Sequence, residues 1–442
     1  MDINDRATRR ALFISYAASF LVQITLNTSA VFASSLFLSS YPSRWLSYYY
    51  IADPLLIIIT FFVSTTILSK ALPKQSFTFV LFCLGIVLVL FLLANAKIYI
   101  MPFALALLMS SYSRLYWNYV SNAISSAFDI RVYKRNAFRF QMTGTLGGLL
   151  TSLVSPILIH FFGATILFYV FCTSLLMCMC LALQLNPLVG PATKQHEIVE
   201  TAIHKQPFFR YLFILALLFA TFTILCNFSF QKALMNQFSR DNLATFISLF
   251  DAGIILAGLI LQALLGKRLL IWIGLSGLLL VLPIIYVVMG ISMAIWPTFI
   301  LFLAFKGISD PIKYNFTMPC MHIVLGPYPS IILKKISMYL QGYAIALGGM
   351  LGALIVFVAN HVNLHFFGVF VALVGATATY IALKVSQGYQ ETLLKSIKEH
   401  RFNPNLLNLT RESALLMRED ILKSINRDDP NSIRTGLAFF EQ

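Results

Sequence analysis

Long apolar runs without charges are the feature of this sequence that most restricts its fold. Of the 442 residues, 59% are hydrophobic and only 11% are charged, whereas a soluble domain is about half apolar and about a quarter charged. A water-soluble chain of this size has no interior large enough for so much apolar surface. An apolar run of about 20 residues, in contrast, crosses a bilayer as one helix. The composition therefore predicts an all-α, polytopic membrane protein.

Twelve such runs can be separated, and they fall into two groups of six. The first group is expected near 11–37, 46–69, 76–95, 99–127, 141–162 and 164–185. The second group is expected near 211–230, 243–265, 269–289, 292–312, 337–359 and 366–385. The predicted domains are an N-terminal six-helix bundle (1–188), a cytoplasmic linker (189–208), a C-terminal six-helix bundle (209–386) and a cytoplasmic helical tail (387–442).

The basic residues that flank the predicted spans favour one orientation. With the N-terminus in the cytoplasm, most of them fall on the cytoplasmic side, including Lys313 just after the tenth run. The outer side then holds Arg44, Lys97, Lys232 and Arg240. This asymmetry agrees with the positive-inside rule. It predicts cytoplasmic N- and C-termini and, as the location, a bacterial cytoplasmic (inner) membrane.

The formal net charge of +15 does not indicate a protein that binds a nucleic-acid polymer. The polar tail from residue 387 is neutral, so the whole excess lies in the apolar part of the chain. No run of five like charges occurs in the sequence, although such runs are typical of nucleic-acid-binding tails. Membrane lipid is the expected partner of these basic loops.

Polar residues inside two apolar runs repeat at corresponding places in the two halves. Arg114 precedes Asn118 by four residues in the fourth run, and Lys306 precedes Asp310 by four residues in the tenth. Residues four apart lie on one face of a helix. Each half therefore presents a cation and a polar or acidic partner on one helix face.

Two further features recur between the halves. Glycine clusters at 144–148 and 348–352 occupy the fifth and eleventh runs, where they let helices approach closely. Asp53 and Asp251 lie in the second and eighth runs, nearer the outer surface. Two related six-helix halves joined by a cytoplasmic linker are the layout of the major facilitator fold, in which the solute binds between the halves.

The polar residues of the fourth and tenth runs are the candidate substrate-binding residues: Arg114, Asn118, Asn122, Lys306 and Asp310. A charge inside a membrane costs roughly 2.5–3.5 kcal/mol, so it requires a partner or a wet cavity. Arginine suits an anionic substrate because its planar fork binds two oxygens. The Lys306–Asp310 pair stays open to two further interpretations, a structural ion pair and a carboxylate that binds a coupling proton.

A second set of residues is expected to act in gating or coupling. Asp53 and Asp251 are placed to contact basic residues near the outer surface, and otherwise sit solvated at the rim. Asp129 lies in a basic loop and is expected to pair with Arg131 or Arg135 as an inner latch. The same basic loop also has a simpler interpretation as a determinant of membrane topology.

Several stretches resemble the ATP/ADP translocase family of nucleotide transporters. They are 33–38, 117–135, 261–268 and the region from Lys306 to Gly349. The resemblance is stronger to the bacterial branch in which HEAT-like helical repeats follow the transporter, and the tail is similar to a partial array of this kind. It implies a major-facilitator-like fold and exchange of nucleotides across a membrane.

The chain departs from this family's pattern in two spans. The first span has Gln23 and Asn27 in place of a lysine, and the seventh has Asn227 and Gln231 in place of an acid. Two alternatives to a nucleotide transporter therefore remain open. One is a non-transporting scaffold or receptor of the same fold, with a protein partner bound through 389–442. The other is a major facilitator transporter of a different small solute.

An enzyme is not expected from this sequence. The seven histidines and six cysteines show no metal-ligand spacing, so neither a metal site nor a cofactor is predicted. The phosphate-binding pattern of ATPases is absent, which argues against primary pumping by this chain. A small anionic solute, with nucleotide as the first candidate, is the expected binding partner.

Overall fold

The structure is a computed structural model that shows a helical chain without strands in the part that it describes. The described residues are 3–42, 44–63, 73–96, 98–128, 130–185, 207–235, 238, 240–325, 336, 339–361 and 364–398. The predicted linker up to residue 206 and the tail beyond Lys398 lie outside these residues. The all-α prediction is confirmed.

The first six helices follow the first six predicted spans. They are α1 (Ile3–Ser40), α2 (Arg44–Val63), α3 (Pro73–Asn95), α4 (Met101–Ser126), α5 (Ile130–Phe162) and α6 (Ile166–Leu185). The next group comprises α7 (Pro207–Leu234), α8 (Arg240–Trp272), α9 (Gly274–Ile295), α10 (Phe299–Ile312), η4 (Lys313–Thr317), α11 (Met318–Val324), η5 (Tyr339–Ala344), α13 (Ile345–His361) and α14 (Leu364–Lys398).

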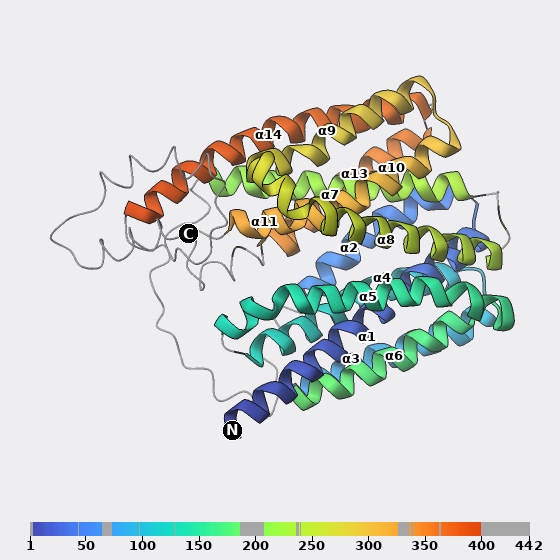
Figure 1. Ribbon diagram of the computed structural model, residues 1–442. Coiled ribbons are helices and arrows are strands. Elements are labelled where there is room, and N and C mark those ends of the chain that lie inside the picture. Colours follow the sequence, from blue (N-terminus) through green and yellow to red (C-terminus); the bar gives the residue numbers. More distant parts are fainter. Residues whose placement is uncertain are drawn as a thin grey trace. The chain divides into compact units, whose positions relative to one another are not determined.

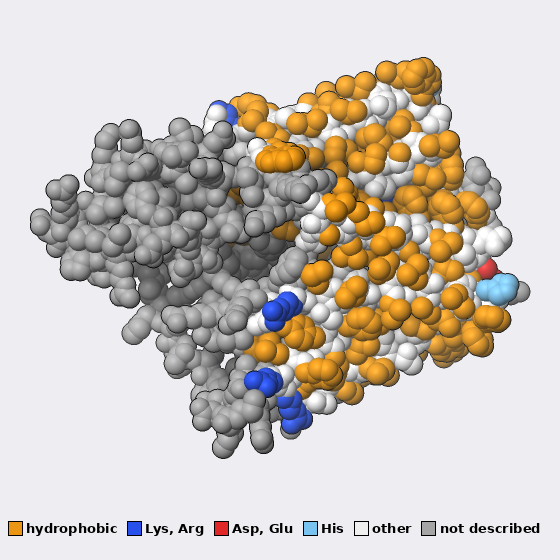
Figure 2. Space-filling model, in the orientation of Figure 1, with side chains coloured by type: hydrophobic (Ala, Val, Ile, Leu, Met, Phe, Trp, Pro, Cys, Tyr) orange, Lys and Arg blue, Asp and Glu red, His pale blue; other side chains and the backbone are white. Residues whose placement is uncertain are grey.

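Eight helices of the described chain are long and apolar enough to cross a membrane. Two shorter apolar segments, Met101–Ser113 and Gly342–Val358, belong to further predicted spans. The hydrophobic side chains that cover the visible face of the helices in Figure 2 agree with contact to lipid. The prediction of a polytopic membrane protein is confirmed, and the full count of twelve spans stays a prediction.

The boundaries of the eighth, ninth and tenth spans differ from the predicted ones. The eighth helix continues to Trp272, and α9 begins at Gly274, five residues after the predicted start at 269. Gly274 adopts a positive φ of 71°, a conformation that glycine reaches without strain and that ends the preceding helix. The next break falls at 296–298, where the sequence reads as nearly continuous apolar chain.

The helices pack into two compact units. Unit 1 contains Met1–Ile198 and Phe228–Leu256, and unit 2 contains Val199–Asn227 and Ala257–Gln442. In unit 1, α1 packs against α4, α5 and α6, and in unit 2, α9 packs along α14 and beside α10 (Figure 1). The sequence-based domain limits at 188, 208 and 386 stay a prediction.

Glycines bring helix pairs into close contact in both units. A Cβ atom added to Gly147 of α5 would lie 2.5 Å from the carbonyl oxygen of Phe20 in α1. A Cβ atom added to Gly348 of α13 would overlap the carbonyl oxygen of Leu217 in α7. The fifth span therefore packs on the first as the eleventh packs on the seventh, and both glycine clusters have the close-packing role that the sequence predicts.

Candidate functional site

Lys306 of α10 forms a compact polar cluster with α7. Its Nζ donates to Asp310 Oδ2 at 2.7 Å and to Asn227 Oδ1 at 2.9 Å. The side chains of the ion pair are 13% and 11% exposed. The four-residue spacing thus brings Lys306 and Asp310 into contact as predicted, while the contact with Asn227 was not predicted.

A second lysine of the same helical stretch belongs to this region. Lys313, the first residue of η4, is 5% exposed, and its Nζ donates to Thr223 Oγ1 at 2.8 Å. The same Nζ lies 3.4 Å from the Tyr314 hydroxyl and 4.6 Å from the centroid of its ring. The sequence-based assignment of Lys313 to a cytoplasmic loop is wrong, because the helical chain continues through it from α10 to α11.

The two lysines contact α7 at two successive turns of that helix. On α7, Thr223 and Asn227 are one turn apart, and on α10 and η4, Lys306 and Lys313 are about two turns apart. The lower-numbered residue of α7 meets the higher-numbered lysine, so the two helices run antiparallel at this contact. Both of these lysine contacts lie in unit 2.

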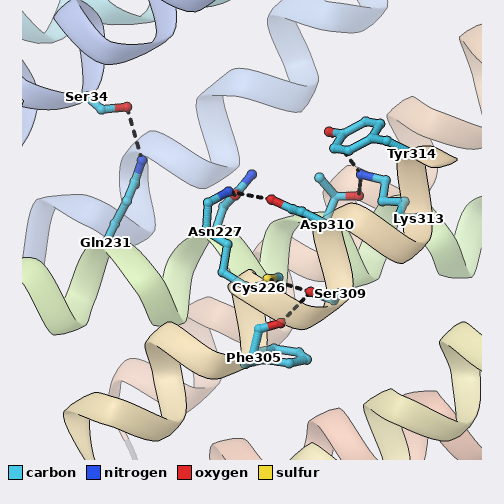
Figure 3. A network of polar contacts seen from close by, with 11 residues as sticks. Ser34, Cys226, Asn227, Gln231, Phe305, Ser309, Asp310, Lys313 and Tyr314 are labelled. Atoms are coloured by element: carbon cyan, nitrogen blue, oxygen red, sulfur yellow. Dashed lines mark hydrogen bonds and ion pairs between the residues drawn. The ribbon is translucent and has the colours of Figure 1, made fainter. Parts of the chain in front are cut away.

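Buried aromatic and small polar residues pack around the two lysine contacts. Tyr286 of α9 stacks on Phe222 at 3.7 Å between ring centroids and meets Phe305 edge-on at 4.8 Å. These two phenylalanines directly precede Thr223 and Lys306 in the sequence. Close by, Ser309 Oγ lies 3.4 Å from Cys226 Sγ and donates to the Phe305 carbonyl oxygen at 2.6 Å (Figure 3). The packing fixes the helix faces that carry the lysines.

The backbone is irregular where Lys313 lies. Pro311 has no N–H group, so the α-helical hydrogen bond from this position is missing. The chain then forms the π-helical turn η4, and Asn315 Nδ2 donates to the Pro311 carbonyl oxygen at 2.8 Å. Interrupted helices of this kind are frequent at functional sites and at the binding sites of transporters.

The predicted residues of the first half have known helix positions but undescribed side chains. Arg114, Asn118 and Asn122 lie on α4, and Arg135 lies on α5. Their side chains, and the whole of Asp129, fall outside the described part of the structure. Their predicted roles in binding and gating stay predictions.

The two predicted outer carboxylates lie on α2 and α8. Asp53 is buried, and its Oδ1 accepts a hydrogen bond from Ser110 Oγ of α4 at 2.8 Å. Asp251 is half-buried on α8. Asp53 is therefore held by a neighbouring helix of unit 1, and the predicted gating role of both residues stays a prediction.

The end of α7 makes polar contacts with α1 and α2 within unit 1. The Tyr50 hydroxyl donates to Gln231 Oε1 at 2.8 Å. Gln231 Nε2 donates to Ser34 Oγ at 3.4 Å (Figure 3). Farther along, the backbone N–H of Ala164 donates to Asp241 Oδ1 at 3.0 Å. Sequence reasoning missed these contacts, because each joins residues more than 70 positions apart.

Two amides of the first span, Gln23 and Asn27, stand where the resembled family has a lysine. They hydrogen-bond to each other and to α5. Gln23 Nε2 donates to Asn27 Oδ1 at 3.2 Å, and Asn27 Nδ2 donates to the Gly148 carbonyl oxygen at 3.2 Å. The amides therefore join α1 to α5 at the glycine cluster. This is the helix-to-helix role that amides commonly have in membrane bundles.

Comparison with known proteins relates the fold to solute transporters. No family model and no curated protein matches the sequence. The crystal structure of the nucleoside transporter NupG is similar with a TM-score of 0.55 at 15% identity, covering 86% of this chain and 99% of that chain. The POT family peptide transporter PepTSo is similar with a TM-score of 0.58 at 11% identity, covering 87% and 99%.

A third similar structure is the peptide transporter POT in complex with sulfate, with a TM-score of 0.55 at 14% identity, covering 87% of this chain and 95% of that chain. These identities establish a shared fold rather than a shared solute. The chain is thus an all-helical integral membrane protein with the major-facilitator-like fold of these transporters.

Proposed function

We propose that this chain is a secondary transporter that moves a small anionic solute across a membrane by alternating access. The observation that carries the proposal is the polar cluster of Lys306, Asp310 and Asn227 between the apolar helices α7 and α10. Ionisable residues within membrane segments are costly and mark solute or ion pathways. The fold shared with nucleoside and peptide transporters supports this assignment.

Nucleotide is the first candidate for the solute, exchanged in the manner of the ATP/ADP translocases that the sequence resembles. Phosphate groups are multiply charged oxyanions, and they are bound by arginine forks and lysine ammonium groups. Arg114 on α4 and a lysine of the stretch from α10 to η4 would supply one cation from each six-helix half. Asn118, Asn122, Lys306 and Asp310 would contact other parts of the solute.

The experiment that tests this function is uptake into proteoliposomes that contain the full chain. We expect saturable uptake of labelled ATP or ADP, accelerated by unlabelled nucleotide inside the vesicle, and no uptake of neutral adenosine. Uptake of adenosine or a dipeptide without nucleotide uptake would contradict the solute class. No uptake of any solute, together with a protein retained on 389–442, would favour the scaffold alternative.

Substitution of Arg114 tests the contribution of the first half. Arg114→Gln removes a charged hydrogen-bond donor from the proposed site, so we expect anion uptake at low concentration to fall at least about tenfold. Arg139→Gln is the matched control, because Arg139 lies exposed on α5. Equal uptake by both variants would remove Arg114 from the binding site.

The remaining predicted residues are proposed to act when the transporter changes state. Asp129 and Arg135 would form an inner latch, whereas Asp53 and Asp251 would act nearer the outer surface. Both termini would be cytoplasmic in a bacterial inner membrane. A reporter fused after Gln442 that is active only in the cytoplasm tests this orientation, and a periplasmic reporter signal would contradict it.

The Tyr50–Gln231 contact is proposed to hold α2 and α7 together in one state of the cycle. Tyr50→Phe deletes the hydroxyl that donates to Gln231. One net hydrogen bond is worth about 0.5–1.5 kcal/mol, so we expect up to about a tenfold shift toward the separated state. Labelling of a cysteine introduced at Ser34 measures this shift, with Tyr48→Phe as the exposed control. Unchanged labelling would contradict this role.

A further inference from the structure

Lys313 is a buried cation whose charge the described protein does not neutralise. Its partners are two hydroxyl oxygens, those of Thr223 and Tyr314, and the face of the Tyr314 ring. No carboxylate of the described chain lies within the 4.0 Å ion-pair distance of its Nζ. A buried ammonium group with neutral partners is costly unless an anion completes its environment.

The neighbouring charges do not meet this need. Asp310 is bound to Lys306 at 2.7 Å, so this carboxylate and this ammonium group neutralise each other. Together, Lys306, Asp310 and Lys313 carry one net positive charge. This excess resides on Lys313, in the middle of the helical stretch from Phe299 to Val324.

The surroundings of Lys313 contain further unsatisfied polar capacity. The hydroxyl of Thr317, one turn later in η4, is fully buried and has no hydrogen-bond partner among the described residues. The π-helical turn that begins at Lys313 also interrupts the regular backbone hydrogen-bond pattern. An anion-binding site would account for all three features at this place: the unneutralised charge of Lys313, the unbonded hydroxyl of Thr317 and the irregular turn η4.

We propose that Lys313 is the residue that binds the anionic group of the solute, and that Lys306 and Asp310 form an internally neutral pair beside it. The inference rests on the proposed transport function and assigns a substrate class to it. The solute carries at least one oxyanion group, a phosphate or a carboxylate, which the Lys313 ammonium group and the Thr223 hydroxyl bind. Tyr314 flanks this group with its ring and hydroxyl.

The first test requires no knowledge of the solute. In the empty protein, Lys313→Met replaces an unneutralised charge with an apolar side chain of similar length, so we expect the melting temperature Tm to rise by about 2–4 °C. Lys384→Met is the matched control, because Lys384 is half-buried and also lies over a tyrosine ring. A fall in Tm for Lys313→Met alone would show a structural tie to α7 and overturn the inference.

The second test compares anions with their neutral partners in binding to the full chain in detergent. The probes are AMP against adenosine, for a phosphate, and lactate against lactamide, for a carboxylate. We expect wild type to prefer at least one anion by tenfold or more, Lys313→Met to lose this preference, and Lys313→Arg to retain it. The preferred pair identifies the oxyanion.

The outcomes separate this inference from the proposed function. Anion uptake and anion preference that Lys313→Met keeps in full would overturn the role of Lys313 and leave the transport function intact. A wild-type protein that prefers neither anion over its neutral partner would also overturn the inference. If proteoliposomes with the wild-type protein take up none of the tested solutes, the proposed transport function itself is overturned.

Discussion

Lys306→Met is expected to lower the free energy of unfolding by about 3 kcal/mol, because it leaves the Asp310 carboxylate buried without its cation. For a chain of 442 residues, this corresponds to a fall in Tm of about 3 °C. Thermal unfolding of the full chain in detergent measures the effect. The expected change in Tm has the opposite sign to that of Lys313→Met, although both variants replace a lysine of the same helical stretch with methionine.

A double variant provides the control for this prediction. In Lys306→Met/Asp310→Leu, both charges are absent, so we expect most of the lost stability to return. The same double variant should still lack normal transport if the pair orients the solute. A Lys306→Met protein as stable as wild type, or a double variant less stable than either single variant, would contradict the ion pair seen in the structure.

Gly348→Ala is expected to destabilise the C-terminal unit by about 1–3 kcal/mol, because the added methyl group meets backbone rather than a mobile side chain. The Cβ atom would overlap the Leu217 carbonyl oxygen and lie 2.8 Å from the Ala220 Cβ. Gly253→Ala is the matched control, since its Cβ would meet no atom within 4 Å. This control should gain up to about 1 kcal/mol from helix propensity.

Thermal unfolding and the yield of folded protein measure the difference between the two glycine variants. The expected result is opposite signs for the same chemical change at two helical glycines. Equal stability of Gly348→Ala and Gly253→Ala would show that α13 and α7 do not approach as closely as the structure has them.

Hydrophobic run length and helix periodicity were sufficient to predict most of the helical architecture. The runs contain so few charges that their extent follows from the cost of placing charge in lipid. The prediction was wrong near Gly274, because it placed a loop at Lys267 and Arg268, whereas α8 continues through both residues to Trp272 and the positive φ of Gly274 marks the break. It was also wrong at Lys313, which a polarity argument alone places outside the membrane span.

The candidate site was predictable within a helix and unpredictable between helices. The Lys306–Asp310 contact follows from a spacing of four residues, and Lys313 shares the same face because seven residues make about two turns. The partners Asn227 and Thr223 lie 79 and 90 positions away in the sequence, and only packing brings them to the lysines. No local pattern encodes this pairing.

The most direct test of the account is the charge dependence of transport by the wild-type protein. Proteoliposomes with the full chain should take up at least one labelled anion (ATP, ADP, AMP or lactate) at least tenfold faster than its neutral counterpart, adenosine or lactamide. A vesicle that transports the neutral compound as fast as the anion, or transports neither, would contradict the central claim that cations on α10 and η4 select an anionic solute.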